Sequence, residues 1–482
     1  MSQDPKPSRS THSGVASHRN WTRRSLLCGL AGAGLAAAHS SSAAAGEPEA
    51  LIQPTEPTQN QLPRPAFPLQ IESGKRFLSD RQGHPFFLHG DTAWSLIADL
   101  DRQDANLYLE DRRGRGFNTI LSNLIEHHFS RNAPRNAYGD EPFTVAGDFS
   151  TPNEAYFAHA DWVLERAAEL GMLVLLVPAY LGFGGGKEGW YQAMRANGPE
   201  KLRQYGRFLA KRYARFQNIV WVHGGDFNPP DRSLTRSLAE GIREVASHFL
   251  HTAHCGPETM ASDFWGDEPW LDFNTLYTYG PVHLQAEKAA RRREGRPFIL
   301  LESAYENEHG ADAHRIRMQA YQALLYGACG HFFGNNPVWH FDGPGVHPAP
   351  NKWGDALDSP GAQSMKQLAI VFSGIQWWTL QPDIGNQFLV HGGTGVHGKA
   401  FAAYAKDGSI AVVYTPDSGS IKIDSALFGD LPLDANWYDL TNGRLHRHAL
   451  PISMRSQVGA ARPPVRNPAS KTDWLLIVRS AS

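Results

Sequence analysis

Residues 161–177 read Asp-Trp-Val-Leu-Glu-Arg-Ala-Ala-Glu-Leu-Gly-Met-Leu-Val-Leu-Leu-Val. Apolar residues recur at positions 162, 163, 167 and 170, a spacing that predicts a helix with one buried face. Residues 172–177 then form an unbroken apolar run, which predicts a strand buried on both faces. A helical pattern followed by such a strand is the repeating unit of a parallel sheet covered by helices.

The same alternation continues from about residue 77 to residue 380. Helical patterns include residues 199–216, where Pro199 stands at a position typical of a helix start. Seven short segments rich in apolar residues predict strands, at residues 86–89, 119–121, 172–177, 219–222, 273–277, 298–301 and 331–333, and a weak eighth lies near residues 252–254. Eight strands within about 300 residues predict an α/β fold, a (β/α)₈ TIM barrel over residues 69–380.

A doubly wound open sheet is the alternative α/β architecture. Its dinucleotide-binding members carry a Gly-x-Gly-x-x-Gly turn after a strand. Residues 182–187, Gly-Phe-Gly-Gly-Gly-Lys, follow a predicted strand but end in Lys187 where the third glycine would stand. We interpret this segment as a loop, and we expect no cofactor.

Beyond residue 380 the pattern changes to short apolar segments broken by Gly, Asp and Asn. Examples are residues 400–404, 410–414, 421–423 and 474–478. This pattern of short apolar segments separated by turn residues predicts a small all-β sandwich domain over residues 383–482. Residues 439–443, Asp-Leu-Thr-Asn-Gly, contain an Asn-Gly pair that predicts a hairpin turn.

The first 45 residues have the organisation of a cleaved export signal. A basic region ends in Arg23-Arg24, an apolar stretch from Leu26 to Ala38 is too short to span a bilayer, and Ala43-Ala44-Ala45 supplies a small-residue cleavage site. Paired arginines predict export of the twin-arginine type, and Cys28 lies too early in the apolar stretch for a lipid anchor. We expect a periplasmic or secreted protein without a stable membrane anchor, with a Pro-rich linker at residues 46–68.

Composition excludes some partners. Lys and Arg number 46, Asp and Glu 48, and the net charge of −2 gives no basic surface for nucleic acid. Cys255 and Cys329 are compatible with a disulfide or with two buried thiols. The sequence leaves the oligomeric state open.

Two carboxylates follow predicted strands. Catalytic groups of a TIM barrel lie at the carboxyl ends of its strands, where Asp226 follows the fourth strand and Glu302 the seventh, nearly opposite each other. Glycoside hydrolysis needs one carboxyl to protonate the leaving oxygen and another to attack the sugar or activate water, and a separation of ~5 Å favours retention. Asp226 could instead cap a helix or turn before Pro229. Glu302, after four apolar residues, has fewer structural explanations.

Other residues near strand ends are candidates for substrate contacts: Asp91, Trp94, His127, His128, Tyr277, Tyr305 and Asn335. Asp91 could instead be a helix N-cap, and the aromatic residues could pack in the core. His127 and His128 lack the patterns of zinc sites, so we expect no metal. The absence of a Gly-x-Ser-x-Gly pentapeptide disfavours a serine hydrolase.

Four blocks together resemble the apiosidase-like glycoside hydrolases: residues 86–94 (FFLHGDTAW), 108–118 (YLEDRRGRGFN), 224–229 (GGDFNP) and 297–306 (PFILLESAYE). The resemblance covers about residues 70–380. It implies a retaining (β/α)₈ barrel with Asp226 as the acid/base and Glu302 as the nucleophile. Residues from about 383 onward resemble the collagen-binding-type β domain that follows the barrel in this family.

One position departs from the wider clan of retaining barrels, which places Asn-Glu where this chain has Gly225-Asp226. Asn228 is then the candidate for the usual Asn contact to the sugar 2-hydroxyl. The resemblance implies an enzyme that removes sugar units, apiose or a related residue, from a plant or microbial polysaccharide by double displacement, and the N-terminal pattern predicts its export. The alternative is a non-catalytic carbohydrate- or matrix-binding protein, whose Asp226 and Glu302 would lie far apart or be blocked.

Overall fold

The computed structural model describes residues 64–292, 295–392, 394–395, 398–417, 419–448, 458–464 and 473–480. The predicted export signal, residues 1–45, and residues 46–63 of the predicted linker lie outside the described residues. Within the described ranges, no helix is both long and apolar enough to cross a membrane.

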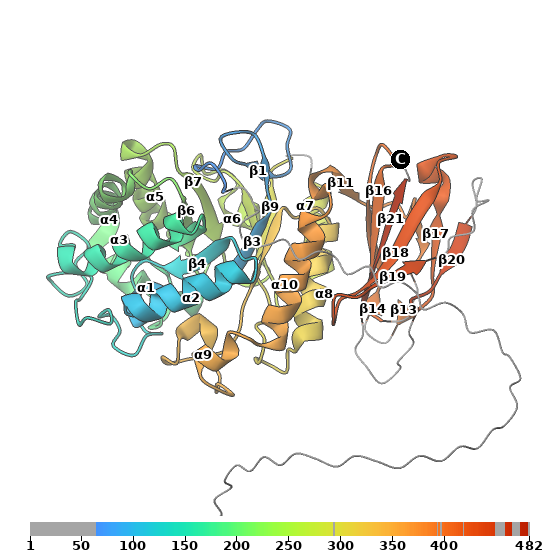
Figure 1. Cartoon of the computed structure of the whole chain (residues 1–482). Helices are drawn as coiled ribbons and strands as arrows, with labels where there is room; N and C mark the ends of the chain where they lie inside the picture. The colour runs from blue at the N-terminus through green and yellow to red at the C-terminus, as the bar shows by residue number, and fades with distance from the viewer. Residues whose placement is uncertain are drawn as a thin grey trace, which may run out of the picture. The chain divides into compact units, whose positions relative to one another are not determined.

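In the described part of the chain, eight parallel strands form the sheet of the first domain (Figure 1). Their spatial order is β7-β6-β5-β4-β3-β10-β9-β8. The strands are β3 (Leu88–Thr92), β4 (Thr119–Asn123), β5 (Leu173–Val177), β6 (Ile219–Gly224), β7 (Leu250–His254), β8 (Asn274–Tyr277), β9 (Phe298–Glu302) and β10 (Gly330–Phe333). All eight predicted strands are confirmed.

The sheet curls into a barrel. β3 pairs with β4 on one side and with β10 on the other, so the first strand lies next to the last. Between β7 and β8, the Asp272 N–H donates to the His251 carbonyl. The hydroxyls of Thr252 and Thr275 donate across the same seam. The barrel is therefore confirmed over the doubly wound sheet.

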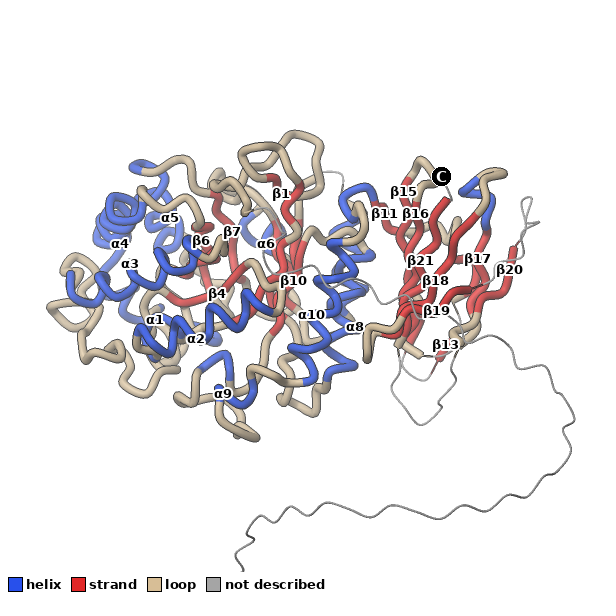
Figure 2. Tube along the Cα trace, in the orientation of Figure 1, coloured by secondary structure: helices blue, strands red, loops and turns tan. Residues whose placement is uncertain are grey.

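Helices lie outside these strands (Figure 2). The predicted helix at 161–170 starts earlier, at Glu154, because the Asn153 side chain caps it by accepting the Ala155 N–H. Pro199 begins the second half of a kinked helix, after Gly198 with φ 73°. The helices are α1 (Leu96–Asp99), α2 (Arg102–Gly114), α3 (Glu154–Glu169), α4 (Tyr191–Tyr213), α5 (Ser233–Val245), α6 (Ala261–Trp265), α7 (Val282–Ala290), α8 (Ala313–Leu325), α9 (Trp353–Ala356) and α10 (Pro360–Ser373), with 3₁₀ turns η1 (Phe183–Gly185), η2 (Val338–His340), η3 (Trp377–Thr379) and η4 (Ser425–Phe428).

Strand residues alternate between two apolar layers. Leu173, Leu175 and Val177 of β5 pack in the barrel interior, whereas Val174 and Leu176 pack against the helices. The interior is thus a filled core, and a site can form only where the strands end.

The C-terminal residues form two antiparallel sheets. Among the described residues, one sheet has the order β11-β15-β16-β21-β18-β19 and the other β12-β17-β20. Apolar residues of both, such as Val413, Ile423 and Trp437, share one core, which confirms the sandwich. The strands are β11 (Leu380–Pro382), β12 (Leu389–His391), β15 (Phe401–Ala405), β16 (Ile410–Thr415), β17 (Ile421–Asp424), β18 (Leu433–Asp439), β19 (Leu445–His448), β20 (Val458–Ala461) and β21 (Trp474–Ser480).

Shorter features complete this picture. Gly443, with φ 75°, lies in the predicted turn that joins β18 to β19, so that hairpin is confirmed. Two small antiparallel pairs are β1 (Leu78–Ser79) with β2 (Pro85–Phe86), and β13 (Thr394–Gly395) with β14 (Gly398–Lys399). Cys255 and Cys329 are both buried and free, which decides between the two readings of these cysteines.

A buried ion pair connects the barrel to the sandwich. Arg317 of α8 contacts both carboxylate oxygens of Asp473, which directly precedes β21. The Tyr414 hydroxyl donates to the same carboxylate at 3.0 Å, and neither charged side chain is more than 6% exposed. The two domains therefore share charged as well as apolar contacts.

Candidate active site

Glu302 is the last residue of β9 and is buried at the barrel mouth. In β9, Leu300 packs against the helices and Leu301 packs inside the barrel. Strict alternation would turn Glu302 toward the helices, but the β8–β9 register shifts here, so that Tyr277 lies opposite Glu302. Such irregularities re-aim side chains at barrel rims, and here the shift presents Glu302 to the mouth.

Two side chains contact the Glu302 carboxylate. The Tyr279 hydroxyl donates to Oε1 at 2.9 Å, and His254 Nε2 lies 2.7 Å from Oε2. Burial raises the pKa of Glu302, and the charge of Asp226 raises it further. The contacts with His254 and Tyr279 act in the opposite direction and stabilise the ionised form.

Asp226 follows β6 in a tight turn. Gly224, Gly225 and Asp226 all have positive φ, of 101°, 125° and 53°. A Cβ on Gly225 would lie 2.2 Å from Tyr180 Cδ2, and one on Gly224 would lie 2.3 Å from the His254 carbonyl oxygen. Only glycine fits these positions, and the two glycines let the chain turn so that Asp226 faces the mouth.

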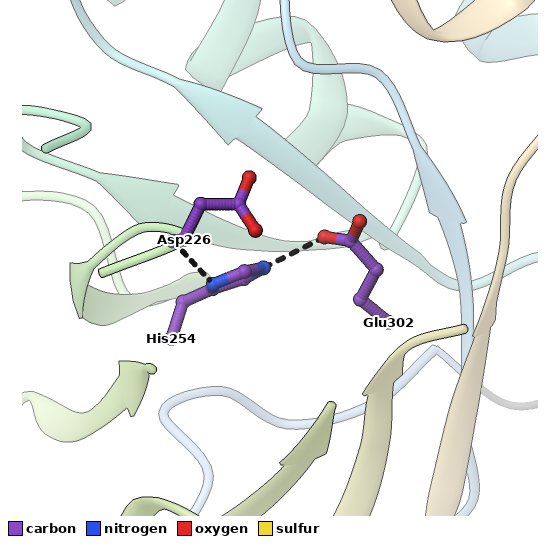
Figure 3. Close-up of side chains that lie close together, drawn as sticks. All are labelled: Asp226, His254 and Glu302. Atoms are coloured by element: carbon purple, nitrogen blue, oxygen red, sulfur yellow. Dashed lines mark hydrogen bonds and ion pairs between the residues drawn. The ribbon is translucent and has the colours of Figure 1, made fainter. Parts of the chain in front are cut away.

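Asp226 and Glu302 meet around His254 (Figure 3). One oxygen of each carboxylate and a ring nitrogen of His254 all lie within 4.8 Å of one another. The Asp226 backbone N–H donates to His254 Nδ1 at 3.1 Å. The Tyr180 hydroxyl donates to Asp226 Oδ2 at 2.6 Å, whereas Oδ1 has no hydrogen-bond partner in the described structure. Burial and the charge of Asp226 raise the pKa of Tyr180, so this phenol stays a donor.

Three of the predicted contact residues lie in this group. Trp94 Nε1 donates to the Tyr305 hydroxyl at 2.9 Å. The rings of Trp94 and Tyr277 lie 5.6 Å and 4.8 Å from the His254 ring. Trp94 and Tyr277 therefore lie next to His254, Tyr305 contacts Trp94, and contact of all three with substrate stays a prediction.

Asp91 lies elsewhere. It points from β3 toward α2, where it accepts from the Tyr108 hydroxyl at 2.6 Å and lies 3.6 Å from Arg112. It caps no helix, because the residue before α1 is Ser95. Burial raises the pKa of Asp91 to about 6, partly offset by Arg112. The carboxylate belongs to the layer between sheet and helices, away from the mouth.

Asn228 and Asn335 connect loops. Asn228 accepts from the Gly256 N–H at 3.0 Å and donates to the Thr259 hydroxyl, which ties the loop after β6 to the loop after β7. Asn335 donates to Glu306 at 2.9 Å, and Glu306 in turn accepts from the Gly361 N–H at the start of α10. Neither amide contacts Asp226 or Glu302 in the part of the chain that the structure describes.

His127 and His128 lie in the loop after β4. Glu126 accepts the backbone N–H groups of both histidines and of Phe129, which holds this loop in place. His127 packs edge-on against Trp190 at 4.7 Å, and His128 is exposed. Within the described residues, neither ring hydrogen-bonds to the carboxylate pair.

Two residues of the site escape the sequence reasoning. His254 is the last residue of β7, just as Glu302 is the last residue of β9. It is missed at the level of sequence because the pattern at residues 252–254 predicts a strand only weakly. Tyr180 lies three residues beyond β5, and none of the predicted contact residues lies in the loop after that strand. Tyr279 lies two residues beyond β8 and contacts Glu302 directly.

Asp226, His254 and Glu302 are also close enough together to hold a metal ion. However, His254 Nε2 and Glu302 Oε2 are separated by 2.7 Å, a hydrogen-bond distance that accommodates a proton between them. A bound cation would need both atoms to move apart. The geometry therefore fits a hydrogen bond between His254 and Glu302 better than a metal centre.

Two family models match the chain. Residues 72–379 match the model described as "Apiosidase-like, catalytic domain", and residues 384–479 match "Putative collagen-binding domain of a collagenase". No curated protein matches the sequence.

Solved structures share the fold. A glycoside hydrolase is 25% identical with a TM-score of 0.75, over 86% of this chain and 97% of that one. A glycoside hydrolase family 5 protein from Bacteroides vulgatus is 24% identical with a TM-score of 0.75, over 86% and 92%. Another Bacteroides vulgatus protein, described as "a putative glycoside hydrolase", is 15% identical with a TM-score of 0.67, over 88% and 83%. The barrel and the sandwich together thus have the architecture of glycoside hydrolases.

Proposed function

This chain belongs to the apiosidase-like family, and we propose that it is an exported retaining glycosidase with Asp226 as acid/base and Glu302 as nucleophile. The observation that carries the proposal is that an oxygen of each carboxylate lies within 4.8 Å of one of the other. Carboxyl groups about 5–5.5 Å apart allow direct attack on the sugar, whereas inverting enzymes need roughly 6.5–9.5 Å to admit a water.

In the first step, Glu302 attacks the anomeric carbon while Asp226 gives a proton to the leaving glycosidic oxygen. Asp226 Oδ1 suits this transfer because Oδ2 already accepts from Tyr180. In the second step, Asp226 takes a proton from water, and the resulting hydroxide displaces Glu302 from the sugar. Two inversions at the same carbon restore its configuration.

The aromatic side chains and the family suggest the substrate. Trp94 and Tyr277 pack against His254 beside the pair, and Trp94 donates to Tyr305; aromatic faces of this kind suit the carbon faces of a sugar ring. The family match supports apiose or a related sugar as the unit removed from a plant or microbial polysaccharide. The N-terminal sequence pattern supports export to the periplasm or the medium, where such polymers occur.

The alternative, a non-catalytic carbohydrate- or matrix-binding barrel, would have its two carboxyl groups blocked or more than ~10 Å apart. Their approach to within 4.8 Å opposes it. The sandwich domain remains available for attachment in either case.

Glu302→Gln tests the proposal. The amide has the size of the carboxylate but cannot attack carbon, so turnover of aryl glycosides and pectic side chains should fall by at least ~10⁴-fold. Glu110→Gln, which removes a surface carboxylate paired with Arg166, should retain full activity. NMR of the first-formed product should show the substrate's anomeric configuration. Near-normal turnover would contradict the assignment of Glu302, and an inverted product would contradict the two-step mechanism.

A further inference from the structure

The two ring nitrogens of His254 contact the Glu302 carboxylate and the backbone N–H of Asp226 (Figure 3). Nε2 lies 2.7 Å from Glu302 Oε2, and Nδ1 accepts the Asp226 backbone N–H at 3.1 Å. The side chain is fully buried. One ring therefore bridges the end of β9 and the loop after β6.

The Asp226 amide determines which ring nitrogen carries a proton. A backbone N–H can only donate, so the nitrogen that faces it, Nδ1, must offer its lone pair. The ring proton then lies on Nε2 and points at the Glu302 carboxylate, which can only accept when ionised. A ring protonated on both nitrogens would turn its Nδ1–H to the Cys255 carbonyl, 3.1 Å away, and leave the Asp226 N–H facing another donor.

The surroundings fix the ring in this orientation. Trp94 and Tyr277 pack against it. The His254 carbonyl also accepts the Gly225 N–H at 2.8 Å, so the loop of Asp226 is held by the backbone and by the ring of the same residue. Movement of His254 would disturb Glu302 and Asp226 together.

The charged groups that face the ring are Glu302 from β9 and Asp226 from the loop after β6. Burial lowers the pKa of His254, while Glu302 and then Asp226 raise it, and the net direction is upward. The two carboxylates favour a ring protonated on both nitrogens, whereas the Asp226 amide opposes a proton on Nδ1. Measuring the protonation state of the ring therefore shows which of these effects prevails.

We propose that His254 is a positioning residue, which as a neutral imidazole with its proton on Nε2 orients ionised Glu302 and fixes the loop that carries Asp226. This role rests on the proposed function of the two carboxylates. The ring keeps their spacing through both displacement steps and takes no proton from the substrate.

Two substitutions separate the two contacts. His254→Gln places an amide nitrogen near the position of Nε2, which keeps a donor for Glu302 but removes the acceptor for the Asp226 N–H. His254→Asn places an amide oxygen near the position of Nδ1, which keeps that acceptor but removes the donor to Glu302. Each of the two variants therefore serves as the matched control for the other.

The kinetic result differs between them. In His254→Asn, the acid limb of the kcat/KM profile should move about one to two pH units upward, because a donor to a charged group is lost. In His254→Gln, that limb should stay in place while kcat falls about tenfold or more with little change in KM, because the loop of Asp226 loses its anchor. If both variants keep the wild-type limb, His254 does not stabilise the Glu302 anion; if both shift it equally, the Nε2 donor is not the cause, and either result would overturn the proposal.

A spectroscopic measurement needs no activity. ¹⁵N NMR of the full chain with labelled histidine should show the His254 ring protonated on Nε2 at neutral pH, with a signal that moves in Glu302→Gln. A ring protonated on Nδ1, or on both nitrogens, would overturn the proposal even if the variants are poorly folded. Full activity of Glu302→Gln would instead overturn the proposed function, so the two failures are distinguishable.

Discussion

Replacing Tyr279 with phenylalanine removes one hydroxyl group and leaves the ring. That hydroxyl donates to Glu302 Oε1 at 2.9 Å. A hydrogen bond to a charged group contributes about 1.5–3 kcal/mol. Because Tyr279 is 44% exposed, water can partly replace the lost donor, and the lower end of this range applies. The expected loss is therefore about 1.5 kcal/mol of stabilisation of the Glu302 anion.

The direction of the pH effect follows from the role of Glu302, which must be ionised to attack the sugar. Burial already raises the pKa of Glu302, and loss of a donor to its anion raises that pKa further. A free energy of about 1.5 kcal/mol corresponds to about one pKa unit and to a factor of about ten in rate. The acid limb of the kcat/KM profile should move up by about one pH unit. At pH values below that limb, kcat/KM of Tyr279→Phe should be about tenfold lower than that of the unchanged protein.

The assay is the pH dependence of kcat/KM on an aryl glycoside. Tyr404→Phe is a matched control, because its hydroxyl donates to Gln387 at 2.7 Å in the sandwich domain and its loss should leave the profile unchanged. An acid limb that stays in place in Tyr279→Phe, or moves to lower pH, would refute the view that this hydroxyl stabilises the nucleophile.

Three further changes test other features. Asp473→Asn leaves Arg317 buried and without its counter-ion, so the free energy of unfolding in urea should fall by about 3–5 kcal/mol, and a loss below about 1 kcal/mol would contradict the importance of the pair. Gly225→Ala should displace Tyr180 and lower turnover at least ~tenfold with unchanged circular dichroism, whereas Gly83→Ala, with positive φ but no atom within 4 Å, should keep full activity. Burial raises the pKa of Asp91 to about 6, so folding favours its protonated form and stability should fall, by up to about 3 kcal/mol, as the pH rises from about 4 to about 6. Asp91→Asn should flatten that part of the stability curve, and parallel curves for the two proteins would argue against the assignment.

The barrel could be predicted because most of its strands are local apolar runs. Periodicity in sequence reports the number and order of such runs, and these set the architecture. The face that a strand-end residue presents is a different matter. Asp91 and Glu302 are both acidic residues at or near a strand end, yet Asp91 faces α2 and Glu302 faces the mouth. The register shift between β8 and β9 makes the difference, and it depends on pairing between strands, which no single run encodes.

The turn after β6 shows how a departure at one position is accommodated. Where the wider clan has Asn-Glu, this chain has Gly225-Asp226, and the sequence suggests Asn228 as the replacement for the missing amide. In the structure Asn228 binds Gly256 and Thr259 instead. The Tyr180 ring occupies the space into which a side chain at position 225 would extend, since even a Cβ there would lie 2.2 Å from it. Glycine at 225 and tyrosine at 180 therefore depend on each other: the glycine admits the ring, and the hydroxyl of that ring holds the carboxylate of the next residue at 2.6 Å. An Asn introduced at 225 alone would not restore the clan's arrangement, because Tyr180 would first have to be removed, and its hydrogen bond to Asp226 would be lost with it.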